Sequence, residues 1–223
     1  MSFTCVLIGE GTLPLQCAQS LLLEGHRVHG IVSSDASFLR WAQGKGIPHA
    51  EPTQDLAGFL SRQPFDYLFS IVNEHILSHD VLRIPGTCSI YYHDSPLPRY
   101  AGTHATSWAL MNREKCHGVT WHVISDRVDA GDILKQRLVE VEDNETAFTL
   151  NGKCYEAAIS SFAELVEELS CGRAVAKKQD LTERTFHARY RRPPAGCIFS
   201  WSRDALDISA CVRALDFGPY QIR

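Results

Sequence analysis

The stretch FTCVLIGEG, residues 3–11, is a short apolar run that stops at two closely spaced glycines. Its composition favours a buried β-strand over residues 3–8, closed by a tight turn. Pro14 then stands near the start of a segment whose apolar residues recur at helical spacing, and Gly25 ends that segment. Residues 27–32 are again β-favouring. The chain therefore opens with a strand, a helix and a second strand.

This alternation continues to residue 71. We expect further helices and strands at residues 38–43 (helix), 47–49 (strand), 56–61 (helix) and 65–71 (strand). Strands that alternate with helices at this spacing form a parallel sheet with helices on both faces. The sequence therefore predicts an α/β fold with a Rossmann-like, mostly parallel sheet. In such sheets ligands bind beyond the carboxyl ends of the strands, here in the loops after Ile8, Ile71 and Tyr92.

The second half of the chain has a different pattern. We expect the following elements there: a helix at 103–111, two strands at 118–124 and 132–141, and a long helix at 145–170. The apolar side of the long helix is predicted to carry Phe148, Ile159, Phe162, Val166 and Leu169. After Gly172 the chain becomes rich in Lys, Arg and Pro. We therefore expect a main domain at 1–183, a linker at 184–197 and the start of a small C-terminal subdomain at 198–223.

The composition excludes several classes of protein. Of the 223 residues, 44% are hydrophobic and 22% charged, which is typical of a globular protein, and the net charge of −4 argues against a nucleic-acid partner. The eight cysteines form no CxxC pair, so we expect reduced thiols and no metal site. No run approaches the ~18 apolar residues of a membrane span, and no basic leader precedes the first strand. We expect a cytoplasmic protein without a membrane contact.

Two polar clusters are candidates for chemistry. The stretch YYHDSPLP, residues 91–98, is a strand that leads into a loop stiffened by prolines, and Tyr91 and His93 share one face of it. The stretch VDAGD, residues 128–132, lies between two expected strands. A buried Asp beside a His would orient the imidazole and favour its charged form, which suits proton transfer or oxyanion stabilisation. The alternative is a turn of Asp, Pro and Gly with a structural His.

These clusters also belong to a longer pattern. The motifs are HDSPLPRYAG (93–102), Trp108, GVT (118–120) and VDAGDIL (128–134). In order and spacing they resemble the signature of formyltransferases that use 10-formyltetrahydrofolate. That family includes methionyl-tRNA, glycinamide ribonucleotide and sugar N-formyltransferases, and formylation domains at the start of peptide synthetases. The resemblance covers most of the chain, and Trp201 and residues 212–215 are similar to the start of the family's C-terminal barrel.

The resemblance implies roles for individual residues. His93 and Asp129 match the family's catalytic His and Asp. The acceptor amine would attack the formyl carbon, His93 would stabilise the oxyanion of the tetrahedral intermediate, and Asp129 would orient His93 and help to remove the amine's proton. The family pattern has Asn two residues before the His, where this chain has Tyr91, a hydrogen-bond donor with a longer reach. Asn73, in the neighbouring loop, is a candidate to stand in for that Asn.

The resemblance also implies where the folate cosubstrate binds. Residues 69–77 are similar to the segment whose backbone holds the pterin ring, and loop 128–132 closes over its other side. The residues assigned to 10-formyltetrahydrofolate in this way are Ser70, Asn73, His75, Leu77, Val128, Ala130 and Asp132. No metal is implied.

The expected function is thus that of an enzyme, a formyltransferase. Its acceptor is predicted to be an aminoacyl group on a carrier protein, with the chain an N-terminal piece of a nonribosomal peptide synthetase and other synthetase domains as partners; a free amino acid or amino sugar is the second choice. Two alternatives stay open: a folate-binding or interaction domain in which Tyr91 impairs catalysis, and a hydrolase of formyltetrahydrofolate that uses water. Residues 189–192 are interpreted as a solvated linker, with contact to an acidic acceptor or carrier as the alternative.

Overall fold

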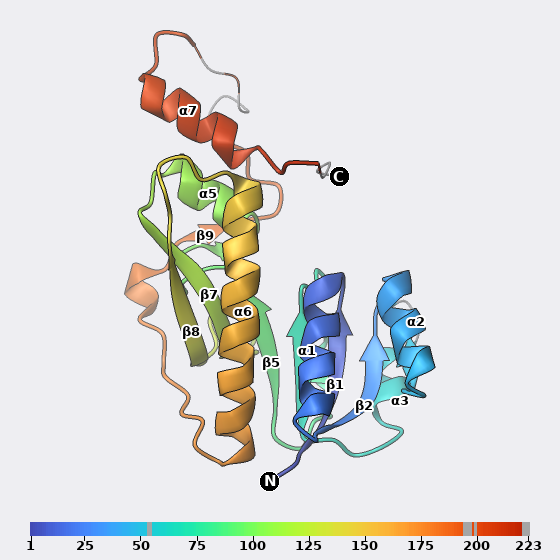
Figure 1. Cartoon of the computed structure of the whole chain (residues 1–223). Helices are drawn as coiled ribbons and strands as arrows, with labels where there is room; N and C mark the ends of the chain where they lie inside the picture. Colours follow the sequence, from blue (N-terminus) through green and yellow to red (C-terminus); the bar gives the residue numbers. More distant parts are fainter. Residues whose placement is uncertain (53–54, 194–197, 199, 220–223) are drawn as a thin grey trace.

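The structure, a computed structural model, describes residues 1–52, 55–193, 198 and 200–219. A seven-stranded sheet of order β3-β2-β1-β4-β5-β7-β8 forms its centre (Figure 1). The strands are β1 (Thr4–Gly9), β2 (Arg27–Val32), β3 (His49–Ala50), β4 (Tyr67–Ile71), β5 (Cys88–His93), β7 (Cys116–Val123) and β8 (Ile133–Glu140). The first five pair in parallel, and β7 and β8 are antiparallel to their neighbours. The predicted mostly parallel α/β fold is confirmed.

Helices cover both faces of this sheet. One face carries α1 (Thr12–Leu23), α2 (Ala36–Gly44) and α6 (Ala147–Ser170), and the other carries α3 (Leu56–Leu60) and α4 (His79–Leu82). Strand β1 shows why both faces are apolar. Cys5 and Leu7 pack into the first core cluster, whereas Val6 and Ile8 pack into the second. Because side chains alternate along a strand, a wholly apolar run such as residues 5–8 needs cover on both sides.

The apolar side of α6 differs from the prediction. Phe148 is 42% exposed and Ile159 39% exposed, whereas Phe162 and Val166 are buried as expected. The buried stripe begins instead with Leu150, Cys154 and Ala158, and Leu165 continues it. The small residues Cys154 and Ala158, four positions apart, let the helix lie close to the sheet. This stripe therefore faces the core, and the larger Phe148 and Ile159 point outward.

Part of the expected linker is folded against the main domain. Strand β9 (Phe186–His187) pairs in parallel with β6 (Ala101–Gly102), and His187 is buried. This pairing joins two segments about 85 residues apart, which local sequence does not reveal. Residues 194–197 of the linker lie outside the described residues. Helix α7 (Ala205–Ala214) packs on α5 (Ala105–Met111) and buries Ala210 and Ala214 (Figure 1).

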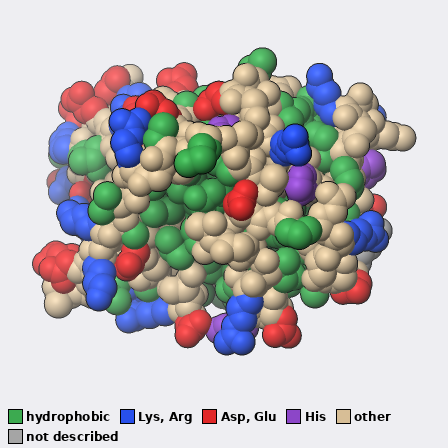
Figure 2. Space-filling model, turned by 90° about the horizontal axis from the view of Figure 1, so that it is seen from below, with side chains coloured by type: hydrophobic (Ala, Val, Ile, Leu, Met, Phe, Trp, Pro, Cys, Tyr) green, Lys and Arg blue, Asp and Glu red, His purple; other side chains and the backbone are tan. Residues whose placement is uncertain are grey.

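The surface carries charges of both signs. Figure 2 shows that most acidic and basic side chains of one face are interspersed around its margin, whereas hydrophobic and uncharged groups fill most of its middle, with few charged groups among them. This mixture agrees with the small net charge of −4. In the part of the chain that the structure describes, no helix combines the length and the apolar character that crossing a membrane requires.

Candidate active site

The carboxyl end of β5 brings the first group of polar side chains together. Strand β5 lies between β4 and β7, and Tyr91 is in register with Ser70 on one side and with His122 on the other. Two residues further on, His93 pairs with Thr120. Paired residues project on the same face of a sheet, so Tyr91, His93 and His122 gather at this end of the strand. Both imidazoles are almost inaccessible, with 3% of His93 and 2% of His122 exposed.

The loop between β7 and β8 adds Asp129. Its backbone lies in the left-handed region with φ 51°, which Asp adopts more readily than most residues. The Gly102 N–H donates to Asp129 Oδ2 at 2.8 Å, and Gln179 Nε2 donates to the carbonyls of Asp129 and Gly131 at 3.1 and 2.7 Å. A Cβ on Gly131 would lie 1.7 Å from the carbonyl oxygen of Val123. The loop is therefore fixed from both sides, and Gly131 is required for its close approach to β7.

Asp129 faces two histidines. Its Oδ1 lies 3.8 Å from His93 Nδ1 and 3.7 Å from His122 Nε2. Burial by itself would raise the pKa of Asp129. The nearby His93, the contact with His122 and the Gly102 N–H outweigh that effect and lower the pKa to about 2. Asp129 is therefore a buried carboxylate that stays ionised at neutral pH.

Backbone carbonyls determine which nitrogen of each imidazole carries a hydrogen. His93 Nε2 lies 2.9 Å from the Tyr100 carbonyl oxygen, and His122 Nδ1 lies 2.9 Å from that of Val123. Because a carbonyl can only accept, these nitrogens carry the hydrogens. The nitrogens that face Asp129, His93 Nδ1 and His122 Nε2, are thus free to exchange protons. Within the described residues, His122 Nε2 is buried without a hydrogen-bond partner.

Tyr91 lies beside both imidazoles. Its ring centroid is 6.3 Å from that of His93 and 5.7 Å from that of His122. Its hydroxyl donates to the carbonyl of Asn73 at 3.2 Å. Burial and then the negative charge of Asp129 raise the pKa of Tyr91, so the phenol stays protonated. The hydroxyl is therefore engaged with the loop after β4.

That loop contains the first set of residues expected to bind folate. Asn73 Nδ2 donates to Ser70 Oγ and to the His75 carbonyl, both at 3.1 Å, and the His75 N–H donates to Asn73 Oδ1 at 3.0 Å. Val72, just before, has φ 51°, a strained conformation for a β-branched residue. The Asn73 amide is consequently used within its own loop.

A cavity of about 480 Å³ lies beside this loop. Asn73, His75 and Leu77 line it together with Leu56 and Ile76. Ser70 is completely buried and does not line the cavity, but its Oγ accepts from Asn73 Nδ2. Three of the expected folate residues thus line the cavity, and the fourth, Ser70, contacts one of them.

The other three expected residues lie in the Asp129 loop, away from this cavity. Val128 is exposed, and its carbonyl accepts from Arg184 Nη2 at 3.0 Å. Ala130 and Asp132 are half-buried, and the Asp132 carbonyl accepts from the Val123 N–H at 2.9 Å. Among the described residues, the walls of the cavity come from the ends of β1 and β2, from the segment before α3, from α3 and α4 and from the loop after β4, and not from these three.

Sequence reasoning missed His122, Gly102 and Gln179. His122 had a usable signal, because a His two residues after Thr120 in an apolar strand projects on the same face as that Thr. The contacts of Gly102 and Gln179 to Asp129 span 27 and 50 residues, and no local pattern shows them. In the described ranges, no group of three or more His, Cys, Asp and Glu side chains could hold a metal ion.

Residues 42–166 match the family model described as "Formyl transferase". The chain belongs to the formyl transferase family. The segment that matches the formyl transferase model includes Asn73, Tyr91, His93, His122 and Asp129, so it contains the whole cluster around the Asp129 carboxylate.

One relative is similar in sequence over most of the chain. This formyl transferase is 33% identical over 165 residues to the bifunctional polymyxin resistance protein ArnA of Wigglesworthia glossinidia brevipalpis. The match covers 70% of this chain and 24% of ArnA, so the chain spans about a quarter of that relative's length.

Two solved structures share the fold. One is WlaRD, a sugar 3N-formyltransferase solved in the presence of dTDP and 5-N-formyl-THF, with a TM-score of 0.80, 18% identity, and coverage of 96% of this chain and 79% of that one. The other is a 4-N formyltransferase from Francisella tularensis, with a TM-score of 0.81, 17% identity, and coverage of 98% and 90%.

Proposed function

We propose that this protein transfers a formyl group from 10-formyltetrahydrofolate to a primary amine. The observation that carries the proposal is the ionised, buried Asp129 between His93 and His122 at the carboxyl end of β5. An amine that attacks a formyl carbon must lose a proton, and the formyl oxygen gains negative charge. The site offers a group for each need.

His93 is suited to the developing oxyanion. Its Nε2–H is held by the Tyr100 carbonyl, which fixes the ring and leaves Nδ1 for the reacting groups. The negatively charged Asp129 carboxylate faces this nitrogen at 3.8 Å, a distance too long for a hydrogen bond. In its cationic form, His93 would donate the Nδ1–H to the oxygen.

Asp129 and His122 are suited to the proton that the amine loses. His122 Nε2 is an acceptor in the neutral ring, because Nδ1 carries the hydrogen that Val123 binds. It lies 3.7 Å from Asp129 Oδ1, so a proton received at either atom remains beside the other. A buried lone pair without a partner is costly in a folded protein, and a role in proton transfer gives it a reason to persist.

The cavity beside Asn73 fits the cosubstrate in size and lining. Its volume of about 480 Å³ lies within the range of small-molecule sites, and Leu56, Ile76 and Leu77 give it apolar walls for a planar ring. Tyr91 links it to the catalytic cluster, since its hydroxyl bonds to Asn73 and its ring lies beside His93. When bound, 10-formyltetrahydrofolate would supply the activated formyl carbon.

For the acceptor we propose an amino sugar linked to a nucleotide as the first compound to test. This choice rests on WlaRD, a sugar 3N-formyltransferase whose structure contains dTDP. An aminoacyl group on a carrier protein and a free amino acid are the other acceptors of the same chemistry, and the same assay compares them.

The test is an acceptor panel with 10-formyltetrahydrofolate. Tetrahydrofolate release is followed by absorbance, and the formylated amine is detected by mass spectrometry. We expect release that depends on one class of amine and that falls at least about a hundredfold in His93→Ala. Formate release without any amine would indicate hydrolysis instead. Folate binding without turnover on any amine would contradict the proposal.

One observation favours a second function, folate binding with impaired catalysis. The Tyr91 hydroxyl donates to the Asn73 carbonyl and is therefore not available as the donor that the family's Asn supplies. The variant Tyr91→Asn separates the two functions. If it creates activity in a protein that had none, the natural chain is a binding protein. If it leaves an existing activity unchanged or lowers it, the chain is an enzyme adapted to Tyr91.

A further inference from the structure

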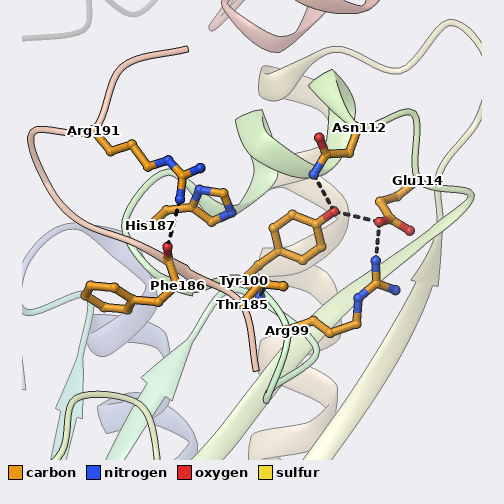
Figure 3. Close-up of a pocket in the computed structure, with 8 residues that line it drawn as sticks. All are labelled: Arg99, Tyr100, Asn112, Glu114, Thr185, Phe186, His187 and Arg191. Carbon is orange, nitrogen blue, oxygen red and sulfur yellow. Dashed lines mark hydrogen bonds and ion pairs between the residues drawn. The ribbon is translucent and has the colours of Figure 1, made fainter. Parts of the chain in front are cut away.

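A second cavity, also of about 480 Å³, lies beside the β6–β9 pair (Figure 3). It is lined by residues just before β6, after α5 and before, in and after β9, and none of them belongs to the Asp129 cluster. Tyr100 lies at the boundary between the two places: its side chain lines the cavity, and its carbonyl accepts from His93.

At one end of this cavity the polar side chains bond to one another. Arg99 forms an ion pair with Glu114, the Tyr100 hydroxyl donates to Glu114 at 2.6 Å, and Asn112 donates to that hydroxyl at 2.9 Å. The Glu114 carboxylate is therefore neutralised by Arg99 and does not offer a negative charge to a ligand.

The other end carries a cation without a counter-ion. Arg191 Nη1 donates to the Phe186 carbonyl at 3.2 Å, and the guanidinium carbon is 5.4 Å from the centre of the Trp108 ring. In the described part of the chain, no carboxylate forms an ion pair with Arg191. Two arginines and one glutamate give the cavity a net positive charge, and Figure 3 shows Arg191 and Arg99 on opposite sides of it.

His187 adds an unpaired, buried polar group. It is 7% exposed and lies between Trp108 and Tyr100, with ring centroids 4.3 and 5.8 Å away and nearly parallel planes. Within the described residues its Nδ1 is buried without a hydrogen-bond partner. Burial, and then the charge of Arg191, lower the pKa of His187, so the ring is neutral. A hydrogen on Nε2 avoids a buried unpaired N–H and makes that nitrogen a donor.

Thr185 supplies a further donor. Its Oγ1 accepts from the Tyr100 N–H at 2.7 Å, which leaves the hydroxyl hydrogen to donate. Arg191, His187 and Thr185 thus offer N–H and O–H groups from different directions around one positively charged space. A planar carboxylate is satisfied by one guanidinium fork, whereas the several oxygens of a phosphate match donors that come from different directions.

We propose that this cavity binds a small molecule through a phosphate group held by Arg191, His187 and Thr185. The site lies outside the proposed formyl-transfer cluster and does not depend on it. Tyr100 lines this cavity, and its backbone carbonyl accepts a hydrogen bond from His93.

The test is a calorimetric titration of the whole chain with inorganic phosphate at pH 7.5 and constant ionic strength. We expect saturable binding of one phosphate per chain. Arg191→Gln should weaken it at least about tenfold, because a charged hydrogen bond is lost. The matched control is Arg192→Gln, which removes the same charge from the exposed neighbouring residue and should change the affinity less than about twofold. If Arg191→Gln does not fold, Arg191→Lys, which keeps the charge and loses the fork, takes its place.

Two results would overturn this proposal. One is a response to phosphate no greater than that to chloride at the same ionic strength. The other is equal weakening in the Arg191 and Arg192 variants, which would show a general charge effect. Asp129→Asn should bind phosphate like the natural protein, so a failure of the proposed transfer reaction leaves this result intact, and the reverse also holds.

Discussion

Two neighbouring positions on one face of β7, Thr120 and His122, differ in how completely their buried polar atoms are hydrogen-bonded. Thr120 and His122 are two residues apart, so they share a face of the strand, and both are buried. Thr120 Oγ1 donates to the Ser95 carbonyl at 2.7 Å and accepts from the Leu97 N–H at 3.2 Å and from Gln136 Nε2 at 2.9 Å. His122 makes one backbone contact and leaves Nε2 unpaired beside a carboxylate.

This difference indicates that Thr120 serves the stability of the fold, whereas the groups around Asp129 serve the proposed reaction. A satisfied network such as that of Thr120 fixes the loop after His93 in one conformation, and any change in it costs stability. The unsatisfied atoms around Asp129 cost stability in the free protein and are useful when a substrate supplies the missing partner. We therefore expect substitutions at Thr120 to lower mainly stability, and substitutions around Asp129 to lower mainly turnover.

The largest effect is expected at Asp129, the charged group beside the unpaired His122 Nε2. Asp129→Asn keeps the size of the side chain and removes the negative charge that faces His93 and His122. Turnover with the best amine acceptor should fall about a thousandfold, within the range attributed to acid–base groups. Steady-state kcat and KM for the amine measure it. A loss confined to KM would mean that Asp129 only binds the acceptor.

His122→Gln should lower kcat about thirtyfold, because the proton acceptor next to Asp129 is lost. Its effect on the free energy of unfolding should stay below about 1 kcal/mol, since a single contact to the Val123 carbonyl is removed. The control is Thr120→Ser, which keeps the hydroxyl on the same face and should retain kcat. If the activity and the melting temperature of His122→Gln fall together, as in a destabilised core variant, His122 is merely structural.

The pH dependence of stability tests the charge on Asp129 directly. Folding lowers its pKa from the ordinary 3.8 to about 2. Its ionised form therefore stabilises the protein above about pH 4, and this contribution disappears as the pH falls toward 2. Urea unfolding of the natural protein and of Asp129→Asn at pH 5, 3.5 and 2 should show a difference that shrinks by about 2 kcal/mol from the highest pH to the lowest. A difference that is constant over this range would contradict an ionised Asp129.

The smallest effect is expected at Thr120, whose hydroxyl has all its hydrogen-bond partners. Thr120→Val keeps the shape of the side chain and removes a hydroxyl that takes part in three hydrogen bonds, so the free energy of unfolding should fall by about 1.5 kcal/mol. Thr120→Ser serves again as the matched control and should lose less. If Thr120→Val lowers kcat and leaves the free energy of unfolding unchanged, the hydroxyl belongs to the reacting site. The contrast between Thr120 and His122 would then be wrong.

Much of the fold could be predicted from the sequence. Wholly apolar runs such as residues 5–8 need two covered faces, and glycine and proline mark the ends of the helices between them. These are local properties, so they predicted the strands β1, β2 and β4 and the helices α1, α2 and α3 between them, whereas the short α4 and the later α7 were not predicted. The short β6–β9 pair and the outward turn of Phe148 and Ile159 on α6 could not be predicted, because they depend on which distant surface the segment meets.

The candidate site divides in the same way. The sequence by itself determined the residue types: His93 in a proline-stiffened stretch, Asp129 beside a glycine that can approach a strand closely, and Tyr91 two residues before His93. The tertiary structure alone decided their relations. The antiparallel pairing of β7 with β5 places His122 opposite Tyr91, and Gly102 and Gln179 hold Asp129 from 27 and 50 residues away. Local sequence fixes which groups are present, whereas protons and charges depend on distances of a few ångströms that only long-range packing sets.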